Sequence, residues 1–167
     1  IQDYRMYTEA KYTSDFIPVS GVPDVVPDSP SGVSHESRLT KPTNGSVWLD
    51  GGGDYLSMSD SADFSMGTGD FTVEAWIYPS ANASYRSIVD CRDATTQATG
   101  WILGVDVTNN IYIYNDSFLL QSGGNAVPEG QWYHVCYERS GGTHTLYVNG
   151  RYQTHSTSSR NYTVDNC

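Results

Sequence analysis

Seven residues between positions 90 and 116 have side chains that could bind a sugar. A sugar ring stacks its apolar side on an aromatic face, while carboxylates, amides and guanidinium groups hydrogen-bond its hydroxyls. In the segment NIYIYND at 110–116, strand alternation would place two tyrosines on one face. Tyrosines at this spacing also serve as ordinary cross-strand packing residues. The candidate ligand-binding residues are Asp90, Arg92, Trp101, Tyr112, Tyr114, Asn115 and Asp116.

Catalytic chemistry is not indicated by the same reading. Retaining glycoside hydrolysis needs two carboxyl groups about 5–5.5 Å apart, which two alternate residues of one strand can provide. No glutamate of the chain has a second carboxylate two residues away, and Glu74 stands between Thr72 and Trp76. There is no G-x-S-x-G segment, and His134 and His144 are more simply explained by packing. We therefore expect no catalytic residues and no enzyme activity.

Calcium is the one cofactor that the composition keeps open. Fourteen of the nineteen acidic residues are aspartates, and several lie in loops rich in Gly, Ser or Asn, namely Asp54, Asp60, Asp90, Asp93 and Asp116. Such loops supply the oxygen ligands that Ca²⁺ prefers. However, no D-x-D-x-D-G loop is present, and aspartate is also a common turn residue. The sequence therefore requires no cofactor, allows Ca²⁺, and names no metal ligands.

The overall charge excludes two classes of partner. With 9 basic and 19 acidic residues, the net charge is 9 − 19 = −10. Such a chain cannot neutralise a phosphate backbone, so nucleic acid is not an expected partner. No apolar run approaches ~18 residues, so no membrane insertion is expected.

The three cysteines do not form a recognisable disulfide framework. Cys91, Cys136 and Cys167 are few and odd in number, and no CxxC pair is present. We expect buried or spare thiols, and the alternative is one bridge with one cysteine left over.

The elements that would position these residues are short strands. The segment FTVEAWIYP at 71–79 alternates cleanly, with Phe71, Val73, Ala75 and Ile77 on one face. Turn residues separate the strands at intervals of 8–12 residues, and no helical stretch exceeds a turn, which is typical of an antiparallel sandwich. The expected strands are 46–50, 55–59, 71–79, 86–91, 100–106, 110–116, 117–122, 131–140 and 143–154.

Four motifs in order resemble a known family. The runs GSVWLDGGGDYLSMSDSADFSMGTGDFTVEAWIYP and GQWYHVCYERSGGTHTLYVNGR resemble laminin-G-like modules of the concanavalin A-like lectin/glucanase superfamily. The matching elements are 50–56, 69–76, 132–135 and 146–150. The resemblance implies an all-β, two-sheet antiparallel jelly-roll sandwich, used as a binding module and often for carbohydrate. It also implies that Trp48, Trp76 and Trp132 belong to the framework and lie in the core.

The chain departs from the family pattern at both ends. The family closes with a strand of the type G-x-I-x-x-V-R-I-Y, whereas this chain stops at NYTVDNC. Residues 1–12 instead resemble that closing strand through Ile1, Asp3, Arg5 and Tyr7. We favour a piece of a tandem array, and the alternative is an N-terminal strand that closes its own module. In either case residues 1–16 should lie against a sheet edge, because an unclosed sandwich leaves a strand unpaired.

The resulting domain prediction has three parts. Residues 1–16 form a closing strand, 17–45 form a Pro/Ser-rich linker, and 46–167 form the jelly roll, lacking its last strands. In style the chain is also similar to tandem modules of bacteriophage virion proteins and bacterial surface proteins.

These features predict a non-catalytic recognition or adhesion module that binds a cell-surface glycan. It would sit in a longer surface fibre or a phage tail fibre, head fibre or decoration protein, at the virion surface or outside the cell. Its other partners would be neighbouring modules and other virion or surface proteins. The alternatives are a structural capsid or tail docking protein without glycan binding and, more remotely, a relative of glycoside hydrolases.

Overall fold

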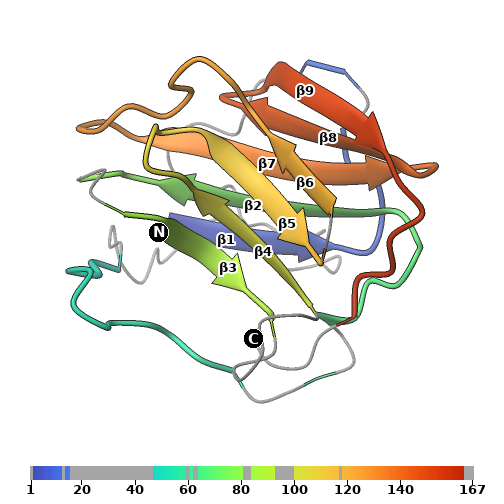
Figure 1. The fold of residues 1–167 in the computed structure, drawn as a ribbon, viewed down its shortest axis with the longest axis horizontal. Coiled ribbons are helices and arrows are strands. Elements are labelled where there is room, and N and C mark those ends of the chain that lie inside the picture. The colour runs from blue at the N-terminus through green and yellow to red at the C-terminus, as the bar shows by residue number, and fades with distance from the viewer. Residues whose placement is uncertain are drawn as a thin grey trace, which may run out of the picture.

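Two stacked antiparallel sheets make up the protein (Figure 1). A computed structural model describes residues 2–12, 14–15, 47–58, 61, 64–80, 84–92, 100–116 and 118–163. Over these residues the chain is an all-β sandwich, which confirms the predicted fold class. The strands are β1 (Gln2–Tyr7), β2 (Phe71–Ile77), β3 (Arg86–Asp90), β4 (Trp101–Val105), β5 (Ile111–Asn115), β6 (Phe118–Gln121), β7 (Tyr133–Ser140), β8 (Thr143–Val148) and β9 (Arg151–Thr157).

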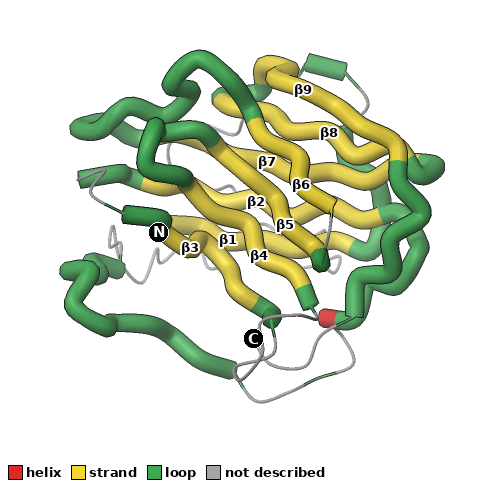
Figure 2. The backbone as a smooth tube through the Cα atoms, viewed as in Figure 1, coloured by secondary structure: helices red, strands yellow, loops and turns green. Residues whose placement is uncertain are grey.

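The chain fills the two sheets in consecutive blocks. The five-stranded sheet has the order β1-β2-β7-β8-β9, and the four-stranded sheet has the order β3-β4-β5-β6. After β2 the chain crosses to the four-stranded sheet, runs back and forth through it, and returns at β7 (Figure 2). Every face position of the smaller sheet therefore comes from one continuous stretch of sequence, residues 86–121.

The hydrophobic core lies between the sheets. Phe71, Val73, Ala75 and Ile77 of β2 all belong to it, as the alternation predicted. They pack with inward side chains of β4, β5, β7 and β8. Burying one such aliphatic or aromatic side chain stabilises a fold by about 1.5–3 kcal/mol, so this shared core holds the two sheets together.

A hydrogen-bonded aromatic cluster closes one end of the core. His144 Nε2 donates to Ser158 O at 3.1 Å, so its Nδ1 accepts from the Tyr137 hydroxyl at 2.6 Å. Tyr137 also hydrogen-bonds the hydroxyl of Tyr162, and burial raises the pKa of Tyr162 to about 12. Tyr162 is joined to Gly67 by two backbone hydrogen bonds. The cluster thereby ties the segment after β9 to the residues before β2.

The N-terminal strand lies at a sheet edge. β1 pairs antiparallel with β2, with Met6 opposite Val73 and Tyr7 opposite Thr72. The Tyr7 hydroxyl donates to Glu74 Oε1 at 3.3 Å. The edge of β2 is therefore covered, although the predicted boundaries of the three domain parts stay predictions.

Residues 8–12 and 14–15 then run across the outer face of the five-stranded sheet. The Tyr12 backbone N–H donates to the Glu138 carboxylate on β7. Farther across, Asp15 Oδ1 accepts from the Tyr152 backbone N–H on β9 at 2.9 Å. Burial under this segment raises the pKa of Glu138 despite the backbone hydrogen bonds it accepts. We call residues 8–15 the strap.

The two strands predicted at 46–50 and 55–59 are wrong over the described residues. Residues 47–58 contain no strand, and Trp48, Tyr55 and Leu56 are 68%, 78% and 75% exposed. The turn between them does form, with Gly52 N–H donating to Asp50 Oδ1 at 2.6 Å. A strand needs a partner edge, and no described strand pairs with this segment.

The assignment of tryptophans to the core is also wrong, for Trp48, Trp76 and Trp132 alike. Trp132 is 39% exposed and packs edge-on against Tyr78, with ring centroids 5.6 Å apart. Trp76 is partly buried, on the outer face of β2 beside His134. Trp76 and Trp132 alternate with core positions and so point outward, whereas Trp48 lies in a segment without a strand.

The single strand predicted at 143–154 is two strands. β8 and β9 are separated by a turn at Asn149 and Gly150, whose φ angles are +50° and +73°. Asn-Gly is the preferred pair for a tight hairpin turn because both positions need positive φ. The Asn149-Gly150 pair therefore indicates this turn, although the segment was predicted as one strand.

The cysteine expectation is wrong for Cys91, which is disulfide-bonded. Cys136 is free and buried, and burial raises the pKa of its thiol well above the ordinary value. The remaining cysteine, Cys167, lies outside the described residues, as does the predicted linker at 17–45. None of the described residues belongs to a helix long and apolar enough to cross a membrane.

Candidate binding site

Alternation along β4 and β5 separates core residues from surface residues of the four-stranded sheet. Leu103 and Ile113 pack into the core. Ile102, Tyr112 and Tyr114 lie on the outer face, because they occupy the positions between the core residues.

The register aligns the outward positions into two rows across the sheet. One row carries small and hydrogen-bonding groups with one tyrosine, and the other carries apolar groups with an acid at its end. The rows are Ser87–Gly104–Tyr112–Gln121 and Asp90–Ile102–Tyr114–Leu119.

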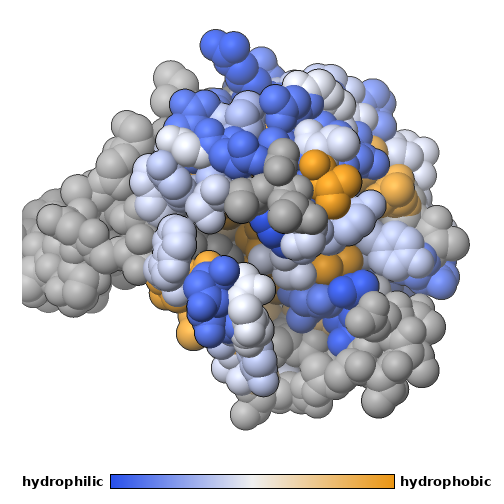
Figure 3. Space-filling view, turned by 60° about the vertical axis from the view of Figure 1, so that its left-hand side comes forward, coloured by the Kyte–Doolittle hydropathy of each residue, from blue (hydrophilic) through white to orange (hydrophobic). Residues whose placement is uncertain are grey.

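These rows form the floor of a groove of about 500 Å³. It is lined by Tyr85, Ser87, Arg92, Ile102, Asp106, Tyr112, Tyr114, Leu119 and Gln121. Among the described residues in Figure 3, apolar side chains surface as separate patches between polar ones. A groove that mixes aromatic, apolar and polar groups in this way is typical of a small-molecule or oligosaccharide site.

Tyr112 is held in place by what lies beneath and beside it. A Cβ added to Gly104 would come within 2.9 Å of the Tyr112 Oη and 2.6 Å of Arg86 O, so the tyrosine crosses the sheet where only glycine leaves room. The ring of Tyr85 packs against it edge-on at 5.7 Å. Burial raises the pKa of Tyr112, and the nearby Arg92 charge opposes that rise.

Arg92 and Asp90 form a two-pronged ion pair at one side of the groove. Arg92 Nε and Nη2 lie 2.8 Å and 2.6 Å from the two carboxylate oxygens. The hydrogen bond with Asp90 is the main cause of the raised pKa of Arg92. This geometry fixes the planar guanidinium, which is the group best suited to planar oxygen acceptors.

Asp106 organises one end of the groove. Burial alone would raise the pKa of its carboxyl, but hydrogen bonds from Asn110 and Thr108 outweigh burial and hold the pKa below its ordinary value. Gln121 Nε2 also donates to Asp106 Oδ2. The side chain of Gln121 is therefore held at the edge of the groove.

Four of the seven candidates come together here, and three do not. Arg92, Tyr112 and Tyr114 line the groove, and Asp90 is bonded to Arg92. Whether they touch a ligand stays a prediction. The other three candidates, Trp101, Asn115 and Asp116, lie outside the groove lining.

Two of these candidates, Trp101 and Asn115, face the core because neighbours in sequence alternate between faces, whereas Asp116 lies beyond the end of its strand. Trp101 is fully buried in the core against Tyr162. Asn115 is buried and its Nδ2 donates to Asn161 O at 3.4 Å. Asp116 lies in the turn after β5 and pairs with Arg160 at 2.7 Å.

Six residues of the groove lining were not among the candidates predicted from the sequence, namely Tyr85, Ser87, Ile102, Asp106, Leu119 and Gln121. Ile102 could have been found, because it lies between the core positions 101 and 103. Leu119 and Gln121 depended on the register between β5 and β6, which places them opposite Tyr114 and Tyr112. The composition of the two strands does not predict that register.

Comparison with known proteins agrees with this architecture. A family model described as the concanavalin A-like lectin/glucanases superfamily matches residues 50–166, which is more than half of the chain. The chain belongs to this superfamily. The resemblance predicted from the four motifs is confirmed. None of the curated proteins matches the chain.

Membership in the superfamily supports a binding module. Both acids at the groove already have partners. Asp90 pairs with Arg92, and Asp106 accepts the Asn110 N–H within its own turn. Glu74 lies on the other sheet, 3.3 Å from His134 Nε2. The geometry thus suits recognition, and the absence of catalysis stays a prediction.

Metal binding remains a prediction as well. Within the described part of the chain, no three His, Cys, Asp or Glu side chains are grouped so that they could hold a metal ion. Asp60 and Asp93, two of the five loop aspartates, lie outside that part.

Proposed function

We propose that this module binds carbohydrate in the groove on its four-stranded sheet, without catalysing a reaction. The observation that carries the proposal is the placement of Tyr85, Tyr112 and Tyr114 beside the Asp90–Arg92 ion pair. Tyr85 is 68% exposed and offers an aromatic face to a sugar ring. The ion pair and Gln121 provide donors and acceptors for its hydroxyls.

Rigidity of the groove supports the proposal. Tyr112 is fixed above Gly104, Arg92 by Asp90, and Gln121 by Asp106. Side chains that are already ordered lose little entropy on binding, and this raises the affinity that a shallow polar site can reach.

The proposed setting is the virion surface or another extracellular surface, where neighbouring modules and other surface proteins would be partners. A disulfide at Cys91 supports it, because disulfides persist in oxidising environments. Ca²⁺ is the cofactor that we propose to test.

A glycan array on the full chain, with calcium and with a chelator, is the first test. We expect binding to a defined set of oligosaccharides, and loss with chelator would make calcium part of the site. For the best ligand, Tyr114→Ala should weaken the affinity about tenfold, corresponding to roughly 1.4 kcal/mol of lost ring contact. Calorimetric titration measures this loss.

The matched control is Tyr152→Ala, which removes a half-exposed tyrosine from β9 on the other sheet. It should leave the affinity unchanged. A folded protein that binds no glycan on the array would overturn the proposal and favour a structural role, with the groove docked against another protein.

A further inference from the structure

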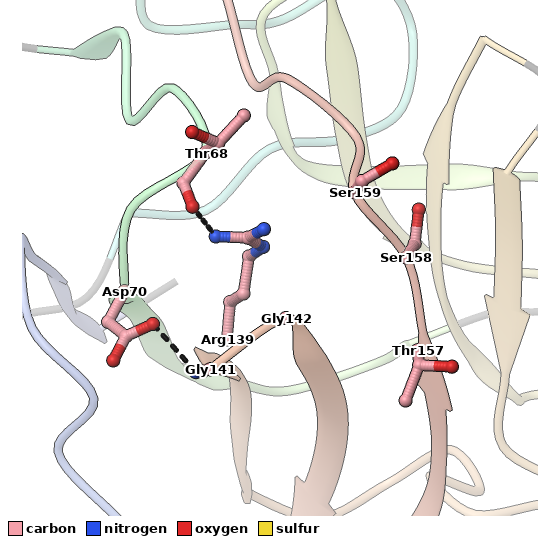
Figure 4. Close-up of a pocket in the computed structure, with 8 residues that line it drawn as sticks. All are labelled: Thr68, Asp70, Arg139, Gly141, Gly142, Thr157, Ser158 and Ser159. Atoms are coloured by element: carbon pink, nitrogen blue, oxygen red, sulfur yellow. Dashed lines mark hydrogen bonds between the residues drawn. The ribbon is translucent and has the colours of Figure 1, made fainter.

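A second hollow lies at the end of the sandwich where β7 turns into β8. It has a volume of about 610 Å³ and opens between the start of β2, the β7–β8 turn and the segment after β9. Figure 4 shows the Arg139 side chain rising into it, with Asp70 on one side and Ser158 and Ser159 on the other. We call this hollow the end pocket, and it is built from residues that the groove does not use.

Arg139 is a charged residue at an inward-facing position. Tyr137 and Val135, which precede it by two and four residues on the same strand, belong to the core. Strand alternation therefore points Arg139 inward as well. It is only 4% exposed. Its Nη1 donates to the carbonyls of Thr68 and Gly69, the latter at 2.6 Å.

Among the described residues, no carboxylate balances the charge of Arg139. No acidic side chain of a described residue lies within ion-pair distance of its guanidinium. Within the part of the chain that the structure describes, its buried Nε has no acceptor and its Nη2 has none either. Buried arginines are nearly always paired, so an unbalanced one facing a hollow calls for an anion.

Asp70 lines the same pocket but does not neutralise Arg139. Its Oδ1 accepts the Gly141 N–H at 2.8 Å, which holds the carboxylate against the β7–β8 turn. Asp70 is exposed, so its charge is screened by water, yet it still opposes the approach of an anion.

The opposite wall of the pocket carries hydroxyl groups. Thr157 and Ser159 are exposed residues of the pocket lining. Ser158 Oγ accepts the Arg160 N–H at 3.1 Å, which leaves its own proton available to donate. A hollow with a guanidinium on one wall and hydroxyl-bearing residues on the other is suited to an oxyanion.

We propose that the end pocket binds an oxyanion through Arg139, either a free small anion or the carboxylate or sulfate group of an acidic sugar. The volume suits a ligand of monosaccharide size. This site shares no lining residue with the groove on the four-stranded sheet. A negative binding result for one site therefore leaves the proposal for the other unaffected.

Nuclear magnetic resonance on the full chain tests the proposal directly. The buried Nε–H of Arg139 is protected from exchange by its burial, so its ¹H–¹⁵N signal reports on the guanidinium. Glucuronate, inorganic sulfate and inorganic phosphate would be titrated separately against chloride at constant ionic strength. We expect a saturable shift of this signal and of the Gly141 and Gly142 amides. The anion that saturates first identifies the source, with glucuronate alone indicating an acidic sugar.

Two variants and one control make the result specific. Arg139→Gln should abolish the saturable shift of the turn amides. Asp70→Asn should tighten anion binding by about threefold, because it removes a negative charge, screened by water, that repels the anion. Arg151→Gln, which removes an exposed arginine of β9, should bind as the native chain does.

Asp70→Asn keeps the test decisive if Arg139→Gln fails to fold. The proposal is overturned if none of the three anions produces a saturable shift in the native chain, or if Arg151→Gln loses the shift. It is also overturned if Asp70→Asn weakens binding, because Asp70 would then be part of the cradle for a different ligand. Tyr114→Ala should leave anion binding unchanged, which separates this outcome from that of the groove.

Discussion

Gly104 shows how one residue without a side chain shapes the groove. Its outward position in β4 faces Tyr112, and the tyrosine ring occupies the space that a Cβ would fill. A glycine inside a strand weakens the strand slightly, and it is found where another group approaches closely. In this protein the approaching group is the aromatic ring at the centre of the proposed site.

Replacing Gly104 with alanine should therefore disturb both stability and binding. The new Cβ would lie 2.6 Å from Arg86 O, which is backbone and cannot move freely. We expect a loss of about 1–3 kcal/mol, as for overpacked sites, and a melting temperature lower by about 3–10 °C. Thermal unfolding measures this change, and the groove ligand should bind more weakly.

Gly123→Ala is the matched control, since an added Cβ there meets nothing within 4 Å. Its stability should stay within about 0.5 kcal/mol of the native chain. Equal melting temperatures for the two variants would show that Tyr112 does not need the space above Gly104.

Among the elements, β1 and the strap carry the largest structural consequence. β1 covers the edge of β2, and the strap covers the outer face of the sheet up to β9. Glu74 and Glu138 are almost fully buried beneath them, at 4% and 2% exposure. Removing this segment would expose both an unpaired strand edge and buried acids.

Deletion of residues 1–15 should lower the melting temperature by about 10 °C or more and produce oligomers. Differential scanning calorimetry and size-exclusion chromatography measure the two effects. A synthetic peptide of residues 1–15 added in trans should restore the monomer, and a scrambled peptide should not. A truncated chain that stays monomeric with the native melting temperature would mean that β1 does not complete this sandwich.

At the scale of the whole molecule, the cysteines are of two kinds. Cys91 is disulfide-bonded at the end of β3, and Cys136 is a free thiol buried beneath the strap. Burial and the nearby carboxylates of Glu74 and Glu138 raise the pKa of the Cys136 thiol. Its thiolate, the reactive form, is therefore disfavoured in the folded protein.

Alkylation followed by mass spectrometry should show no adduct on the native protein and one adduct after unfolding without reductant. Reduction should lower the free energy of unfolding by about 2–5 kcal/mol. Cys136→Ala should keep this sensitivity to reductant, because the disulfide does not involve it. Full alkylation of the unfolded, unreduced chain at all three cysteines would contradict the disulfide.

Strand alternation accounts for most of what could be predicted. The faces of β2 were predicted correctly, because a period of two is a local property of the chain. The same rule, applied to β4, would have placed Trp101 in the core. It was assigned to the surface for its chemistry, and the alternation with Leu103 shows why that choice was wrong.

The local sequence pattern could not predict which segments pair with the edges of the sheets. Residues 47–58 have the composition of strands, yet no described strand pairs with them, whereas β1 reaches β2 across more than sixty intervening residues. Pairing depends on which edge is open, and that depends on the whole chain.

Local sequence thus settled the fold class, the family, the faces of the central strands and the tyrosines of the groove, because periodicity and turn chemistry act between near neighbours. Long-range register placed Leu119 and Gln121 beside those tyrosines. It also left Arg139 buried at the end of the core with no carboxylate partner among the described residues. These features arise from contacts between distant segments, and no single stretch of residues contains them.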